Sequence, residues 1–125
     1  MIFAFLEDGT LEVPEDLIAV QRAYEGVDVE NEVVRFYDES GTYLEPQFIV
    51  PNRRGKTLGI FGWVSSGIFK LVANPQAPQD SFALALYETA TLTPNRWFAT
   101  LEHLKSELAK KGVAVEFLPT ERGEA

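Results

Sequence analysis

The chain contains no cysteine and only one histidine, His103. The lack of cysteine excludes disulfides, thiolate metal ligands and a cysteine nucleophile, and it is typical of proteins in a reducing cytoplasm. A histidine-based triad would depend on His103 alone. On the helix predicted over 93–111, His103 lies about 200° from Leu101 at 100° per residue, so we expect it on the exposed face.

Long apolar runs are also missing. The apolar residues 1–6 are followed at once by Glu7 and Asp8, and no basic segment precedes them. This pattern differs from that of a signal peptide, and no run approaches the roughly 20 residues that span a bilayer. We therefore expect a cytoplasmic protein without a membrane partner.

The composition indicates one ordinary globular domain. The 125 residues are 46% hydrophobic and 12% aromatic, which is enough to bury a core without disulfides. Disorder would require low hydrophobicity together with high net charge, and only the high charge is present. We predict a single domain over residues 1–120 and a disordered polar tail over 121–125.

Basic residues are scarce in the first third of the chain. Residues 1–45 hold twelve acidic residues and two basic ones, −10, whereas residues 46–125 hold seven acidic and nine basic residues, +2. An acidic chain is a poor ligand for nucleic acid, whose phosphates need a basic surface. The imbalance favours a protein partner with a basic surface, although it would also serve solubility alone.

The first half of the chain predicts strands, turns and one helix. Residues 2–6 are typical of a strand, and Asp8-Gly9 of a hairpin turn. Pro14 is expected to open a helix that Gly26 ends. Residues 27–38 are rich in β-branched and aromatic side chains and predict a strand. The next turn is predicted at 38–41 and the returning strand over 42–50, where Pro46 indicates an edge or a bulge.

The second half predicts further hairpins and the best helix. We expect a basic loop over 51–56, then a hairpin of 57–64 with 68–72 whose tip is Ser65-Ser66-Gly67. Residues 82–87 alternate in a way that favours a strand, although their alanines leave a helix open. The helix predicted over 93–111 has Thr93 as its cap and ends at Gly112, and a last strand is predicted over 113–117.

The order of these elements predicts the fold class. Runs of hairpin-linked strands with helices near both ends are typical of an α+β domain. We predict an antiparallel β-sheet of about five to seven strands with two helices packed on one face.

Three short motifs resemble known sites but lack an essential residue or context. Residues 3–10 resemble the opening of haloacid-dehalogenase-type phosphatases, but Leu6 stands where that motif has its nucleophilic aspartate. Gly55-Lys56-Thr57 resembles the end of a P-loop, but Val50 stands where a glycine is needed and the following residues predict a strand. The acidic segments 28–32 and 38–41 lack the glycine and glutamate spacing of an EF-hand. We therefore predict no catalytic residue, cofactor or metal site.

The basic cluster of Arg53, Arg54 and Lys56 could receive an anion or an acidic surface, or it could be a plain exposed loop. Trp63 lies among Gly59, Gly62 and Gly67, which is typical of a close backbone approach. Trp63 thus marks either an interface or the core.

Residues 24–32 and 36–41, together with Leu92-Thr93-Pro94-Asn95-Arg96-Trp97-Phe98, resemble segments of small acidic bacterial proteins without a settled activity. Some of those proteins are similar to immunity proteins, which neutralise a toxin made by the same cell or its neighbours. The resemblance implies a non-catalytic binding protein, but it transfers no functional residue, because immunity proteins share a role and not a motif.

We predict that five carboxylates bind a basic partner: Asp28, Glu30, Glu32, Asp38 and Glu39. Two other functions remain open. A small enzyme using carboxylates would need a pocket lined by at least two acids, and a structural or phage-assembly protein would form an oligomer.

Overall fold

The computed structural model describes residues 1–57, 61–65, 67–76 and 81–117. The predicted tail at 121–125 lies outside them. The described strands are β1 (Phe3–Leu6), β2 (Thr10–Glu12), β3 (Val34–Tyr37), β4 (Tyr43–Val50), β5 (Arg53–Thr57), β6 (Phe61–Ser65), β7 (Ile68–Ala73) and β8 (Thr91–Leu92). The described helices are α1 (Leu17–Ala23), α2 (Gly26–Glu30), α3 (Ser81–Tyr87) and α4 (Leu101–Lys110).

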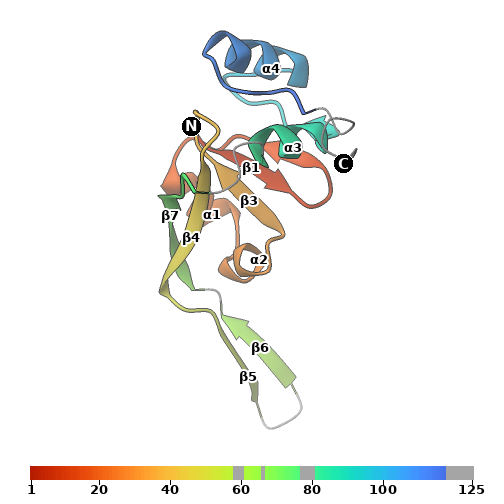
Figure 1. Ribbon diagram of the computed structural model, residues 1–125. Coiled ribbons are helices and arrows are strands. Elements are labelled where there is room, and N and C mark those ends of the chain that lie inside the picture. Colours follow the sequence, from red (N-terminus) through yellow and green to blue (C-terminus); the bar gives the residue numbers. More distant parts are fainter. Residues whose placement is uncertain (58–60, 66, 77–80, 118–125) are drawn as a thin grey trace, which may run out of the picture.

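Six strands form one sheet in the order β7-β4-β3-β1-β2-β8, and β5 and β6 form a separate hairpin. Neighbours in the sheet are antiparallel except β2 and β8, which are parallel. The β5–β6 hairpin extends away from the rest of the molecule (Figure 1). The predicted α+β class and the predicted number of sheet strands are confirmed.

Both faces of the sheet are covered by helices, whereas the sequence predicted that only one face would be. Three successive residues of β1, Phe3, Ala4 and Phe5, are all buried, and side chains of successive strand residues point to opposite faces. One core contains Phe3, Phe5, Leu11, Val13, Tyr37, Phe82, Ala85, Leu86, Leu92, Phe98, Leu104 and Leu108, with α3 and α4 on that face. The other contains Ala4, Val20, Val29, Val34, Phe36, Leu44 and Phe69, with α1 and α2.

The predicted strand over 27–38 is wrong in its first half. The α1 helix begins after Asp16, whose carboxylate accepts a hydrogen bond from the Ala19 amide at 2.9 Å. Gly26 does not end this helix but begins α2, whose Val29 is buried against the sheet. Burial of Val29 therefore outweighs the β propensity of its neighbours.

Pro46 explains why β3 and β4 separate. The Asp38 amide donates to the Thr42 carbonyl at 2.9 Å. This bond fixes which facing residues of β3 and β4 are hydrogen-bonded pairs, since such pairs alternate with pairs that are not bonded. In that register Pro46 would donate to Val34, but proline has no N–H. Pairing with β3 therefore stops at Leu44, while β4 continues beside β7. The edge or bulge expected at Pro46 is thus found only in part: β4 is unpaired on the β3 side there, but it pairs with β7 and is not an edge strand of the sheet.

The hairpin predicted between 57–64 and 68–72 does not form. Instead β6 pairs with β5, and β7 pairs with β4, so the predicted basic loop is largely strand β5. Ser66 lies outside the described residues. The Asn52 side chain closes the hairpin base, because its amide donates to the Gly26 carbonyl at 3.1 Å and its oxygen accepts from the Gly67 amide at 2.7 Å.

The C-terminal third differs from the prediction at three places. Residues 81–87 form helix α3, the alternative that the alanines had left open. The last helix begins only at Leu101, because the Asn95 side chain holds a turn by accepting from the amides of Trp97 and Phe98. Residues 113–117 form no strand.

Candidate functional site

Two hollows meet at Glu32 and Arg35. The first, of about 320 Å³, lies between the β1–β2 turn, β3 and α3. The second, of about 280 Å³, lies between α2, β3 and the part of β4 that Pro46 separates from β3. Both are lined by Glu32 and Arg35, so the two hollows adjoin at these side chains. We call the two together the acidic groove.

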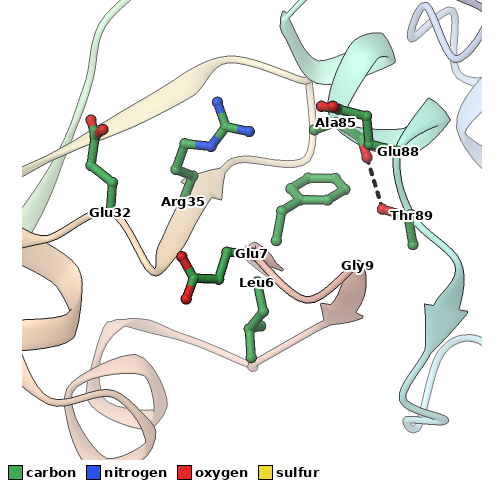
Figure 2. A pocket seen from close by; sticks show the side chains of 9 residues that line it. Leu6, Glu7, Gly9, Glu32, Arg35, Ala85, Glu88 and Thr89 are labelled. Carbon is green, nitrogen blue, oxygen red and sulfur yellow. Dashed lines mark hydrogen bonds between the residues drawn. The ribbon is translucent and has the colours of Figure 1, made fainter.

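The first hollow has an apolar floor and charged walls. Phe5 and Arg35 face each other in the β1–β3 ladder, and Phe5 is buried while Arg35 is exposed. Figure 2 shows Arg35 and Glu88 beside the opening and Glu7 on the other side of the hollow. Charged groups thus surround a buried aromatic ring, which suits a long side chain with an apolar stem and a charged end.

Backbone hydrogen bonds hold the walls of the first hollow in place. The Gly9 carbonyl accepts from the Ala90 amide at 2.8 Å, and the Glu7 amide donates to the Val33 carbonyl at 2.9 Å. Just after α3, a side chain adds a further bond, because the Thr89 hydroxyl donates to the Ala85 carbonyl at 2.8 Å (Figure 2). The hollow therefore exists before any ligand binds.

Glu32 lies at the junction of the hollows in a left-handed backbone conformation with φ 58°. It follows α2. The Glu32 amide donates to the Val29 carbonyl at 3.2 Å, and the Val33 amide donates to the Asp28 backbone carbonyl at 3.0 Å. These two bonds make a Schellman motif, whose left-handed position is usually glycine. Helix α4 ends in the same motif with Gly112 in that position. A glutamate there costs about 1 kcal/mol.

The charge of the groove is strongly negative. Its described lining holds five glutamates and one cation: Glu7, Glu30, Glu32, Glu45, Glu88 and Arg35. Across the residues that the structure describes, no ion pair reaches Glu7, Glu32, Glu45 or Glu88. The charges of the groove also act on Tyr43, which lines it. Burial raises the pKa of Tyr43, the carboxylates of Glu32 and Glu45 raise it further, and Arg35 opposes them.

The five carboxylates predicted from the sequence are divided between two places. Glu30 and Glu32 line the groove, whereas Asp28 lies exposed on α2 outside it. Asp38 and Glu39 lie beyond the other end of β3, a strand about 13 Å long.

Asp38 and Glu39 already have local partners. Asp38 organises the β3–β4 turn by accepting from the amides of Ser40 and Thr42 at 2.9 and 3.0 Å. Glu39 accepts from the Met1 ammonium at 2.8 Å. The groove therefore contains two of the five predicted residues.

Glu7, Glu45, Glu88 and Arg35 were not singled out from the sequence. Glu7 and Glu45 belong to the acidic first third, which was a signal, but nothing marked them as neighbours of Glu32. Glu88 lies far along the chain and reaches the groove only because 81–87 is a helix. No local pattern could have identified it.

No protein-family model matches the chain, and no curated protein or solved structure is significantly similar to it. No helix among the described residues is long and apolar enough to cross a membrane. The described part of the chain also holds no group of three or more histidine, aspartate or glutamate side chains placed to bind a metal ion.

Proposed function

We propose that the domain is a non-catalytic, cytoplasmic protein-binding module whose acidic groove receives a basic segment of a partner protein. The observation that carries the proposal is the set of four glutamates, Glu7, Glu32, Glu45 and Glu88, that share one groove without an ion pair among the described residues. Carboxylates left without a cation attract one from a partner and speed its approach.

The shape of the groove supports a lysine or arginine side chain as the bound group. Its apolar floor of Phe5 and Ala85 can contact the methylene stem, and the surrounding glutamates can pair with the charged end. Arg35 among the glutamates would pair with a carboxylate or carbonyl oxygen of the same segment. A basic peptide segment satisfies both requirements, because its backbone supplies the oxygen.

The strained backbone of Glu32 supports the same function. Glycine would satisfy the Schellman motif at lower energy, so the carboxylate is retained at a cost to stability. In the finer form of the proposal, the domain is an immunity protein or a similar inhibitor. Its glutamates would pair with basic side chains that a toxin such as a nuclease uses to hold phosphates.

The decisive variant is Glu32→Gly, which separates binding from folding. We expect it to raise the free energy of unfolding by about 1 kcal/mol, because glycine suits a φ of 58°. It should also weaken the binding of an arginine-rich probe peptide about three-fold, and the double variant Glu32→Gly/Glu88→Gln about ten-fold. Isothermal titration calorimetry and urea unfolding measure the two effects.

Glu116→Gln is the matched control, since Glu116 is exposed and lies outside the groove. It removes the same charge and should leave peptide affinity within experimental error. Affinity should fall as salt rises, because the attraction is electrostatic. Equal weakening by Glu116→Gln and Glu88→Gln would show that only net charge matters, and the groove proposal would then be abandoned.

A further inference from the structure

Strand β7 forms one edge of the six-stranded sheet (Figure 1). Alternate backbone groups of an edge strand point away from its one neighbour, which here is β4. The Asn74 amide donates to the Tyr43 carbonyl at 2.8 Å, so residues 70 and 72 also bond to β4. By the same alternation, the amides and carbonyls of Phe69, Leu71 and Ala73 point outward. Gln21 supports this assignment, because its side chain donates to the Phe69 carbonyl at 2.7 Å.

The outward groups of Leu71 and Ala73 have no backbone partner among the described residues. An unpaired edge of this kind is a template for another strand. Natural edges are usually protected by charged side chains, proline, a bulge or a covering helix or loop. Here Lys70 is the one charged residue of β7, and the irregularity of the β4–β7 ladder lies at its beginning, near Ile68.

The charge distribution indicates which strand can approach. The whole chain carries −8, so two copies repel each other over most of their surfaces. Residues 46–79, which include β7, contain no aspartate or glutamate. Beside the start of β7, Glu25 shares a hollow with Arg22, Ile68 and Phe69, so this carboxylate has a cation in the same hollow. Two copies that meet through β7 therefore oppose few carboxylates.

We infer that β7 pairs with β7 of a second copy of this chain, antiparallel and about a two-fold axis at Leu71. A two-fold axis makes both copies use the same surface. Leu71 then faces Leu71 of the other copy, and their outward amides and carbonyls bond to one another. Phe69 faces Ala73, whose amide shares the Phe69 carbonyl with the Gln21 side chain or replaces it there. Lys70 faces Val72, which keeps the two lysines apart. The two sheets become one continuous sheet, and the acidic grooves remain open.

Sedimentation velocity over a micromolar to millimolar range tests this pairing. We expect the mass to rise from 14.0 kDa towards twice that value. Ala73→Pro removes an outward N–H at an exposed position near the strand end and should weaken the dimer about ten-fold. Ala73→Ser keeps the N–H and should leave the dimer unchanged. Gln21→Ala frees the Phe69 carbonyl and should strengthen it.

Amide exchange in the unmodified protein gives a second test that does not depend on the folding of a variant. The amides of Leu71 and Ala73 should exchange fast at low concentration and slowly at high concentration, whereas the Val72 amide should be slow at both. Rising salt should strengthen the dimer by screening the repulsion, which is opposite to its effect on binding in the groove. A mass of 14.0 kDa at every concentration, or a dimer equally stable with Ala73→Pro, overturns the inference.

Discussion

The base of the β5–β6 hairpin gives the sharpest prediction of stability, the effect of Gly67→Ala. A Cβ at Gly67 would overlap the Val50 carbonyl oxygen and lie 2.6 Å from the Pro51 carbonyl carbon. These are backbone atoms, so they can give way only if the end of β4 moves. Such movement also disturbs the Asn52 oxygen, which accepts from the Gly67 amide at 2.7 Å.

The magnitude follows from these contacts. Overpacking of this kind costs about 1–3 kcal/mol, and each Asn52 hydrogen bond that weakens costs about 1 kcal/mol. We therefore expect a loss of about 2–4 kcal/mol out of the roughly 5–15 kcal/mol that stabilise a domain. For a chain of this length the midpoint of thermal unfolding should fall by about 10 °C.

Urea unfolding followed by circular dichroism measures the loss, and Gly112→Ala is the matched control. Gly112 has φ 83°, but a Cβ added there would meet no atom within 4 Å, so alanine at this position costs only backbone strain, about 1 kcal/mol. At Gly67, by contrast, the cost of alanine comes from the contact of its Cβ with backbone atoms. If Gly67→Ala unfolds at the same urea concentration as the unmodified protein, or loses less stability than Gly112→Ala, the backbone does not approach Gly67 as closely as these distances require.

Two further predictions concern the two cores. Phe82→Ala should lower the free energy of unfolding by about 3–5 kcal/mol. Phe82 is 2% exposed, and its ring centroid lies 5.7 and 5.4 Å from those of Phe5 and Tyr37. Equilibrium unfolding measures the loss, and a value below about 1 kcal/mol would contradict the packing. Burial, together with the 2.6 Å bond to Glu12, raises the pKa of Tyr24 above its ordinary value of 10.0. The resulting stabilisation is complete below that value and is lost as pH rises above it, so unfolding measured from about pH 8 to about pH 11 should show a steeper decline for the unmodified protein than for Tyr24→Phe.

Turns and amphipathic helices were predictable because their determinants are close in sequence. The Asp38 side chain bonds to amides two and four residues ahead, and Gly9 and Gly41 adopt the positive φ that such turns need. Helix α4 was recognised by its leucine spacing and by Gly112, although its start was placed too early because the Asn95 turn was not anticipated.

Strand pairing and the short helices were not predictable in the same way. Residues 27–30 and 82–87 carry strand-like patterns, yet both become helices because Val29 and Phe82 are buried against the sheet. Similarly, the strand predicted over 68–72 is present, but its partner is β4 and not its neighbour β6. A pattern of side chains specifies which face is apolar and leaves the partner strand open.

The candidate site shows the same division. Composition alone determined that the first third of this protein is acidic, and Glu30 and Glu32, which are close in sequence, do line one groove. Only the tertiary structure decided that Glu7, Glu45 and Glu88 join them, that Asp38 and Glu39 lie apart, and that β7 exposes its backbone. Local bonds depend on residues a few positions away, whereas a groove and a sheet edge depend on where distant strands are placed.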